Sequence, residues 1–496
     1  MLLPDDFHNR RLVANVHPAD WMTPQPRARY NLVVVGGGTA GLVGSIGTGI
    51  LGGAVALIEK RLLGGDCLNF GCVPSKALVR AARVFHSAKG GDTFGVRGGG
   101  ALELDFARVM ERMRRARADI SEHDSARQVS AFGVDVFLGA ARFVARDAIE
   151  VDGRVLRFAR ALIATGGRPR VPSIPGLLAA GYLDTESVFS LTELPRRLTV
   201  IGAGPVGCEL AQAFCRFGST VTLLTRAERV LPREDADVSE LLARQLRSEG
   251  VTLVTRAEVH RIEQRHGKQV CFSSNGAEQS VSADEILVAV GREPNTEGLG
   301  LETAGVRFDE HGIGVNEQLR TSNRRVYAAG DVCSKLKFTH VADAMARVAL
   351  ENALFFGRKK LSAQLVPWCT FTDPEIAHVG VGEKEAYERG FKSYTVPLAD
   401  MDRALVDGEA EGFARIHVGA RGRIAGASVV AAGAGELISE IALAMTAGIP
   451  LGTLGRTIHP YPTRGEVWKR LADEWNRERL TPALRRLLGS FLALRR

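Results

Sequence analysis

Two cysteines lie close together in the segment 64–76, where Cys67 and Cys72 are five residues apart and Gly71 directly precedes the second. In a regular helix this spacing would place the two Cα atoms roughly 8 to 9 Å apart. A disulfide tolerates a Cα separation of at most about 7 Å. A disulfide between them therefore requires a break in the helix, and Gly71 provides the backbone freedom for one.

Lys76 follows Cys72 by one helical turn and would share its helix face. A positive charge there, together with the positive end of the helix dipole, lowers the pKa of a thiol and produces a reactive thiolate. Both cysteines could instead be buried structural residues, a common environment for cysteine. The spacing leaves both interpretations open, and the flanking sequence favours redox chemistry.

A dinucleotide-binding unit precedes the cysteines. An apolar strand at 31–35 runs into a glycine-rich turn and a helix, and the next strand, 55–58, ends in Glu59. The glycines let a pyrophosphate approach the backbone at the helix N-terminus. An acid at the end of the second strand accepts hydrogen bonds from ribose hydroxyls. The motif glycines are Gly36, Gly38 and Gly41.

The same arrangement recurs later in the chain, with strands at 198–201 and 221–224 around a glycine turn and a helix. This internal repeat predicts a second nucleotide-bearing cofactor. Glu209 lies just inside the second helix, where we expect it to face the space between the two cofactors. The glycines of the second motif are Gly202, Gly204 and Gly207.

In the second nucleotide-binding unit, the strand at 221–224 is followed by Thr225-Arg226 instead of an acid. A carboxylate at this position would repel the 2′-phosphate of NADPH, whereas an arginine pairs with it. We therefore predict NADPH as the reductant, with NADH as the alternative. The alternative for Arg226 itself is a solvated surface charge.

Two further strands end in residues suited to a cofactor. The stretch 161–169 reads as a strand that ends in a glycine turn containing Gly166, and the strand at 325–330 delivers Asp331 at its carboxyl end. In open α/β sheets, ligands bind at the carboxyl ends of the strands.

The composition excludes several classes of function. The chain has 496 residues, 64 Lys and Arg against 56 Asp and Glu, and a formal net charge of +8. This balance suits phosphate-bearing ligands, but the arginines are dispersed and no zinc-finger spacing occurs, so we expect neither nucleic-acid binding nor a resident metal. Seven cysteines in so long a chain argue against a secreted disulfide scaffold. Residues 1–29 show no signal-peptide pattern, so we expect a cytoplasmic protein.

Two segments raise the question of a membrane. The stretch 32–58 carries no charge and is long enough to span a bilayer, but its glycines favour a strand–helix–strand unit. The C-terminal segment begins a helix at Thr481-Pro482, with leucines on one face and arginines elsewhere. Such a helix can make peripheral contact with an anionic membrane. The alternative is packing on its own protein or on a partner subunit.

With both nucleotide motifs, the cysteine pair between them and the strand that ends in Asp331, the sequence resembles the pyridine nucleotide–disulfide oxidoreductase family over about residues 30–475. The segment Cys67-Leu-Asn-Phe-Gly-Cys72-Val-Pro-Ser-Lys76 is highly specific for it. Residues 209–219 and Arg233-Glu234-Asp235 are most similar to the mercuric reductase branch. Glutathione reductase and dihydrolipoamide dehydrogenase are other branches of the same family.

The resemblance implies the cofactors and the path of the electrons. Cys72 would face the flavin, Cys67 would be the outer thiol that meets the substrate, and the Lys76–Glu209 pair would lie beside the flavin ring. Electrons would pass from NAD(P)H through FAD to a Cys67–Cys72 disulfide and on to a disulfide or a soft metal ion. FAD would be held at Gly36, Gly38, Gly41, Glu59, Gly166 and Asp331, and NAD(P)H at Gly202, Gly204, Gly207 and Arg226.

The resemblance also implies an α/β fold with two Rossmann-like dinucleotide-binding domains and a C-terminal α+β dimerisation domain, in a homodimer whose active sites use both chains. The expected divisions are an N-terminal extension 1–29, an FAD domain 30–176, an NAD(P) domain 177–290, a return to the FAD domain 291–365, an interface domain 366–475 and a basic tail 476–496.

Two departures from the family pattern concern the acceptor. Disulfide reductases of the family place a histidine before Pro-Thr as part of an acid–base pair with a later glutamate, whereas here Tyr461 takes that place, Glu466 is kept and His459 lies two residues upstream. A tyrosine with a pKa near 10 is a poor base at neutral pH. Mercuric reductase has a tyrosine there, but it also carries a cysteine pair near its C-terminus, and no cysteine follows Cys369 here.

We therefore predict a FAD-dependent NAD(P)H oxidoreductase, similar to mercuric reductase, with catalytic residues Cys67, Cys72, Lys76, Glu209, Tyr461 and Glu466. A dihydrolipoamide dehydrogenase or glutathione-type disulfide reductase is one alternative. An alternative from another class is a flavin-binding redox sensor or a membrane-associated electron carrier.

Overall fold

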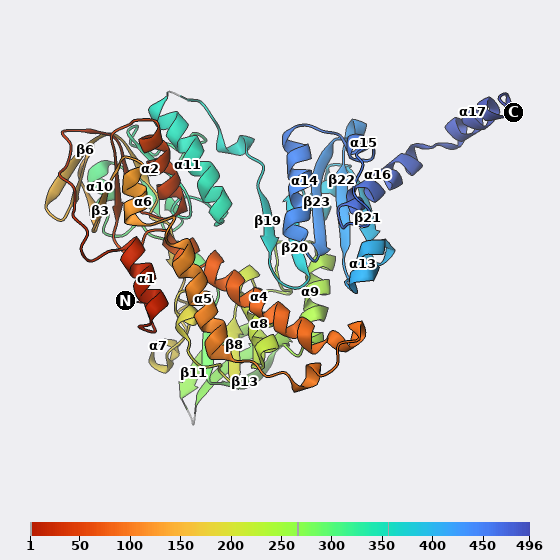
Figure 1. The fold of residues 1–496 in the computed structure, drawn as a ribbon, viewed down its shortest axis with the longest axis horizontal. Helices are drawn as coiled ribbons and strands as arrows, with labels where there is room; N and C mark the ends of the chain where they lie inside the picture. Colours follow the sequence, from red (N-terminus) through yellow and green to blue (C-terminus); the bar gives the residue numbers. More distant parts are fainter. Residues whose placement is uncertain (1, 265–266, 356) are drawn as a thin grey trace. The chain divides into compact units, whose positions relative to one another are not determined.

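The computed structural model describes residues 2–264, 267–355 and 357–496. The chain forms two compact units, one made of residues 1–228 and 246–364 and the other of 229–245 and 365–496 (Figure 1). Helix α9, Ala236–Ser248, crosses the division between them. Within the described residues, none of the helices has the length and apolar character needed to cross a bilayer.

The first unit is built on a seven-stranded sheet. Strands β3, β2, β1 and β6 run parallel in that order, β18 pairs with the end of β6, and β5 and β4 extend the sheet in antiparallel fashion. The strands are β1 Tyr30–Val35, β2 Val55–Glu59, β3 Val134–Leu138, β4 Ala141–Ala145, β5 Ala148–Val151, β6 Arg154–Ile163 and β18 Val326–Ala328.

The repeat of the nucleotide unit forms a second parallel sheet, with the order β10-β9-β8-β14. Beside it lies an antiparallel sheet of β11, β12 and β13, and two short ribbons pair β7 with β15 and β16 with β17. The strands are β7 Gly167–Pro169, β8 Arg197–Ile201, β9 Thr220–Leu224, β10 Thr252–Val254, β11 Ala257–Gln264, β12 Lys268–Ser274, β13 Ala277–Ala283, β14 Glu285–Val288, β15 Arg292–Pro294, β16 Phe308–Asp309 and β17 Gly312–Ile313.

Helices cover these sheets, and two of their contacts position the redox site: α4 packs against α8, and α2 packs against α11. The α-helices of this unit are α1 Phe7–Val16, α2 Thr39–Ile50, α3 Gly65–Asn69, α4 Cys72–Lys89, α5 Phe106–Ile120, α6 Ala126–Ala131, α7 Leu177–Ala180, α8 Pro205–Phe217, α10 Leu301–Ala304 and α11 Thr339–Leu354.

Besides the motif glycine Gly41, helix α2 contains three further glycines, and each costs about 1 kcal/mol of helix propensity relative to alanine. Their absent side chains allow close packing. A Cβ on Gly49 would lie 2.2 Å from the carbonyl oxygen of Phe132, and one on Gly44 would lie 2.7 Å from Leu162. A Cβ on Gly47 would lie 3.2 Å from Leu350 of α11. The uncharged stretch 32–58 is therefore the strand–helix–strand unit that its glycines predict.

The segment 1–29 contains α1, which packs against α5. Asp6 caps α1 by accepting a hydrogen bond from the backbone N–H of Asn9, and Leu12 and Val16 are fully buried. The buried guanidinium of Arg117 donates a hydrogen bond to Asn9 at 2.7 Å. This segment is thus part of the core of the first unit.

The second unit contains a five-stranded antiparallel sheet in the order β19-β20-β23-β22-β21. Helix α14 packs on β19, β20 and β23, and α16 packs on β21 and β22 around the fully buried Trp468. The elements are β19 Pro367–Thr370, β20 Glu375–Gly380, β21 Lys392–Pro397, β22 Phe413–Val418, β23 Ile424–Ala431, α12 Glu383–Glu388, α13 Asp402–Asp407, α14 Ala434–Thr446, α15 Leu451–Leu454, α16 Glu466–Arg479 and α17 Pro482–Ala493.

Candidate active site

The two thiols meet at a break between helices. Helix α3 ends at Asn69 and α4 begins at Cys72, with Gly71 as its N-cap. Both cysteines are free thiols, and Cys67 hydrogen-bonds to Cys72. The interruption that the five-residue spacing requires is present, and it places the two sulfurs within reach of each other.

The two thiols have opposite acidities. The hydrogen bond from Cys67 is the largest of the effects that lower the pKa of Cys72 to about 6. The Thr339 hydroxyl, 3.2 Å from the Cys72 sulfur, and the positive charge of Lys76 act in the same direction. The same hydrogen bond, together with burial, raises the pKa of Cys67. At neutral pH the reduced pair therefore holds a thiolate at Cys72 and a proton at Cys67.

Lys76 and Glu209 form an ion pair with an Nζ to Oε2 distance of 2.8 Å. It joins α4 to α8, the helix that opens the second nucleotide unit. Glu209 is only 2 % exposed, so its charge depends on a partner to offset desolvation. The pair thereby fixes Lys76 on the face of α4 that also carries Cys72.

The first glycine motif fits the pyrophosphate of FAD. Gly36 has φ +105°, and a Cβ on Gly41 would lie 1.7 Å from the Gly36 carbonyl oxygen. A Cβ on Gly65 would lie 2.5 Å from Cα of Gly38, so the backbone before the cysteines lies directly against the phosphate-binding turn. The Glu59 carboxylate accepts hydrogen bonds of 2.6 Å from the backbone N–H groups of Gly37 and Arg61. These hydrogen bonds hold it at the end of β2.

Asp331 lies in a charged cluster at the carboxyl end of β18. Arg292 lies 3.3 Å from Asp331 and 3.4 Å from Asp66, so one guanidinium serves two carboxylates. Burial raises the pKa of Asp66. Gly166 adopts φ +65°, and no atom lies within 4 Å of the position that a Cβ would occupy there. This donor set and open backbone suit the polar part of a flavin cofactor.

The second motif repeats the first. Gly202 has φ +111°, and a Cβ on Gly207 would lie 1.9 Å from the Gly202 carbonyl oxygen. No atom lies within 4 Å of a Cβ on Gly204, which leaves space at the start of α8 for a second pyrophosphate. Arg226 is exposed two residues after β9, and within the described residues it forms no ion pair.

Tyr461 and Glu466 belong to the second unit. Tyr461 is 70 % exposed and donates a hydrogen bond of 2.9 Å to Asp402, which raises the pKa of the tyrosine. Glu466 is the first residue of α16. His459, the displaced histidine, pairs with Glu440 at 3.1 Å.

The structure thus brings together Cys67, Cys72, Lys76 and Glu209 in the first unit. It adds Thr339 and Arg292, which the sequence did not single out. Thr339 lies 267 residues from Cys72, and Arg292 lies 39 residues from Asp331 and still farther from Asp66, so no local spacing could reveal them. A signal for Arg292 existed in the segment 291–294, where a glycine precedes the short strand β15 after the end of β14.

Comparisons with known proteins define the class. The pyridine nucleotide-disulphide oxidoreductase family matches residues 30–346, and the dimerisation domain of that family matches residues 366–472. The chain belongs to this family of FAD-dependent NAD(P)H disulfide oxidoreductases. The match to the dimerisation domain supports a homodimer.

Its curated relatives include enzymes of two kinds. Mercuric reductase of Bacillus cereus is 36 % identical over 89 % of this chain and 70 % of the relative, and that of Staphylococcus aureus is 36 % identical over 90 % and 83 %. Dihydrolipoyl dehydrogenase of Mycoplasma pneumoniae is 33 % identical over 88 % of this chain and 96 % of the relative.

Among solved structures, the HOCl-induced flavoprotein disulfide reductase of Escherichia coli matches with a TM-score of 0.80 and 30 % identity over 90 % of this chain and 99 % of that one. A Cu(II) complex of the same reductase matches with a TM-score of 0.79 over the same shares. The α/β architecture with a C-terminal dimerisation domain is therefore confirmed.

Proposed function

We propose that this enzyme reduces a soft metal ion, taking electrons from NADPH through the Cys67–Cys72 pair. FAD, held at residues that include Gly36, Gly41 and Glu59, would supply the two-electron transfer from NADPH to the disulfide. The observation that carries the proposal is the Cys67–Cys72 pair at the break between α3 and α4, in a chain that has Tyr461, hydrogen-bonded to Asp402, in place of the family's histidine base.

A protonated Cys67 is a poor nucleophile toward a disulfide substrate, because the thiolate is the attacking species. Disulfide exchange therefore needs a base for Cys67. The residue at the family's histidine position is Tyr461, whose pKa the hydrogen bond to Asp402 raises further above neutrality. A soft metal ion binds to sulfur by displacing the thiol proton itself, so it requires no such base.

The relatives support this acceptor class. The first relatives named above are mercuric reductases, and the structural neighbour has been solved as a Cu(II) complex. Among the described residues, no group of three or more His, Cys, Asp and Glu side chains could hold a metal ion. The two thiols are thus the ligands we assign to the metal substrate.

The remaining roles are part of the same proposal. We assign Gly36, Gly38, Gly41, Glu59, Gly166 and Asp331 to FAD, and Gly202, Gly204, Gly207 and Arg226 to NADPH. Lys76 holds the Cys72 charge, and Glu209 positions Lys76. Tyr461 and Glu466 act in a site built from both subunits. We also propose the boundaries of the domains: residues 30–176 and 291–365 form the FAD domain, residues 177–290 form the NAD(P) domain, and residues 476–496 form the tail.

NADPH oxidation with Hg(II), Cu(II), glutathione disulfide and lipoamide as acceptors tests the proposal directly. We expect metal-dependent turnover that the Cys67→Ser variant loses, with slow turnover of both disulfides. Cys369→Ser, at a half-buried cysteine in β19, is the matched control and should keep its activity. Fast lipoamide reduction without metal turnover would overturn the proposal in favour of a dihydrolipoamide dehydrogenase.

A second proposal concerns the tail. All side chains of α17 are exposed, including Leu487, Phe491 and Leu492, and its four nearby arginines carry no acidic counterpart within 482–496. We propose that this helix makes peripheral contact with an anionic membrane surface. Co-sedimentation of the protein with anionic vesicles tests it.

A further inference from the structure

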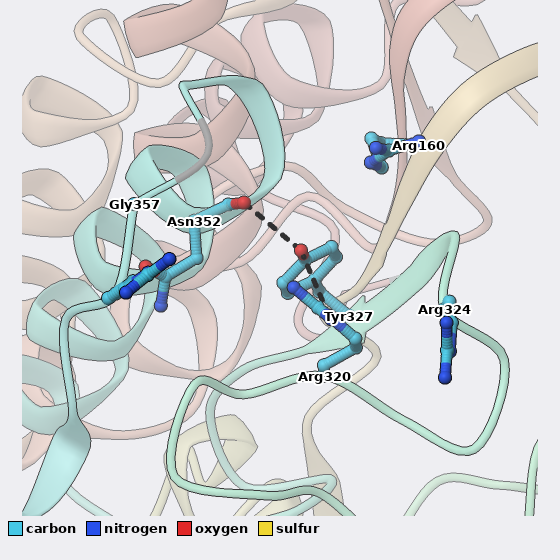
Figure 2. A pocket seen from close by; sticks show the side chains of 7 residues that line it. Arg160, Arg320, Arg324, Tyr327, Asn352 and Gly357 are labelled. Atoms are coloured by element: carbon cyan, nitrogen blue, oxygen red, sulfur yellow. Dashed lines mark hydrogen bonds between the residues drawn. The ribbon is translucent and has the colours of Figure 1, made fainter.

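A pocket of about 300 Å³ lies in the first unit, where the loop before β18 meets β6 and the end of α11 (Figure 2). No part of the proposed electron path uses it. Its lining consists of four arginines and three uncharged residues, namely Arg160, Arg320, Arg324, Arg358, Tyr327, Asn352 and Gly357. Among the described residues that line it there is no carboxylate.

The arginines lack the partners that surface arginines commonly have. Across residues 2–264, 267–355 and 357–496, none of the four forms an ion pair. The nearby Glu351 of α11 is already paired with Lys359 at 2.6 Å. Four guanidinium groups around one small volume repel each other unless an anion lies between them.

Arg160 is only partly hydrogen-bonded by the protein. Its Nη1 donates to the carbonyl oxygen of Ala159 at 2.9 Å, but its Nε is buried and has no hydrogen-bond partner. A buried donor without a partner is costly, and more so when it is charged. The terminal nitrogens of Arg160, and not the buried Nε, are the donors that a phosphate oxygen in the pocket would reach.

Arg320 is held in place by the protein. Its Nε donates to the Tyr327 hydroxyl at 3.3 Å, its guanidinium lies 5.7 Å from the ring centroid, and the hydroxyl donates in turn to the Asn352 carbonyl oxygen at 3.1 Å (Figure 2). The terminal nitrogens of Arg320 keep their donors for a ligand. The negative end of the α11 dipole lies at this pocket, but its half charge is small beside four full positive charges.

We propose that this pocket binds a compact diphosphate or triphosphate anion. Arginine forks match phosphate oxygens in pairs, and the volume lies at the lower end of small-molecule sites. Four positive charges suit several phosphate charges better than one carboxylate. Tyr327 is buried and covered by Arg320, so the pocket offers no aromatic face to a nucleobase.

The pocket shares two elements with the redox site. Strand β18 leads from Arg324 at the pocket to Asp331, and α11 begins at Thr339, beside the Cys72 sulfur, and ends near Asn352. An anion that ties β18 to the end of α11 should stabilise both elements, and it should therefore raise the melting temperature.

Calorimetric titration of the FAD-loaded full chain with pyrophosphate and with triphosphate, at fixed ionic strength and with NADP⁺ saturating the nucleotide site, tests the proposal. We expect one saturable site per chain. Arg320→Gln and Arg324→Gln should each weaken binding about tenfold, the loss of a charge-assisted hydrogen bond. Arg325→Gln, an exposed neighbour outside the pocket, should leave the affinity unchanged.

Arg320 packs on Tyr327, so the Arg320→Gln result counts only if the variant retains FAD and has the melting temperature of the wild type in the absence of ligand. Arg324 is exposed, so the Arg324→Gln variant needs no such check. Absence of saturable binding, or an equal loss in Arg325→Gln, would overturn the proposal. Phosphatidylcholine vesicles that contain phosphatidic acid form a separate arm. Arginine-dependent binding to vesicles without binding of free pyrophosphate would assign the pocket to a lipid headgroup and would refute the soluble ligand.

Discussion

The hydrogen bond from Cys67 to Cys72 gives the two sulfurs different roles before any substrate arrives. Cys72 keeps a negative charge because three groups favour it: the Cys67 thiol, the Thr339 hydroxyl and the Lys76 ammonium. Cys67 keeps its proton, and an acceptor must either remove that proton or displace it. At this scale the choice of acceptor depends on a single proton.

Alkylation of the reduced protein measures this charge. The rate of Cys72 alkylation by iodoacetamide should fall as the pH drops through about 6, because protonation removes the nucleophile. Lys76→Met removes a nearby positive charge and should move the midpoint upward by about one pH unit. Lys89→Met, at the other end of α4, is the control and should not move it. A wild-type midpoint near that of an ordinary cysteine would contradict the assignment.

Arg226 is expected to select NADPH. Arg226→Gln should lower kcat/KM for NADPH by about tenfold, the value of a charge-assisted hydrogen bond to the 2′-phosphate, and should leave NADH unaffected. Steady-state kinetics with both nucleotides measure this ratio. Arg196→Gln, at an exposed position directly before β8, is the matched control. Equal losses with both nucleotides would show that Arg226 is a general surface charge.

At the scale of elements, different glycines of one motif serve helix packing and ligand binding. Gly207 contacts the Gly202 carbonyl so closely that any side chain displaces α8 from β8, whereas Gly204 borders open space. One glycine therefore serves the fold and the other leaves room for a nucleotide.

Two alanine substitutions separate these functions. Gly207→Ala should destabilise the protein by about 1–3 kcal/mol or more through overpacking, seen as a lower melting temperature. Gly204→Ala should leave the melting temperature unchanged and raise the KM for NADPH, because its methyl group occupies the space of the pyrophosphate. A destabilised Gly204→Ala variant with an unchanged KM would contradict this division.

Much of the architecture follows from local pattern. The glycine turns between apolar strands predict β1-α2-β2 and β8-α8-β9, and the cysteine spacing predicts the break between α3 and α4. Helix α1 was missed, although Asp6 as a cap and the four-residue spacing of Leu12 and Val16 carry a helical signal. The contact between Thr339 and Cys72 could not be predicted, because it joins residues 267 positions apart.

At the scale of the whole molecule, the chain combines a catalytic unit with a second unit of the dimerisation type. The last helix stands apart energetically, since none of its side chains is buried. We therefore expect the rest of the protein to be equally stable without α17.

Deletion of residues 481–496 tests this independence. The truncated protein should keep its melting temperature and its dimeric elution in size-exclusion chromatography, because no buried side chain is lost. Co-sedimentation with anionic vesicles should disappear, while phosphatidylcholine vesicles should bind neither form. A dissociated or unstable truncated protein would instead assign α17 to the dimer interface.

Anaerobic titration of the FAD-loaded protein with NADPH tests the central claim, that electrons pass to a disulfide formed by Cys67 and Cys72. The account predicts that the wild type takes up one more equivalent of NADPH than the Cys67→Ser/Cys72→Ser variant. It also predicts a long-wavelength absorption band that Cys67→Ser retains and Cys72→Ser loses. Equal uptake by the wild type and the double variant, with no such band in either, would contradict it.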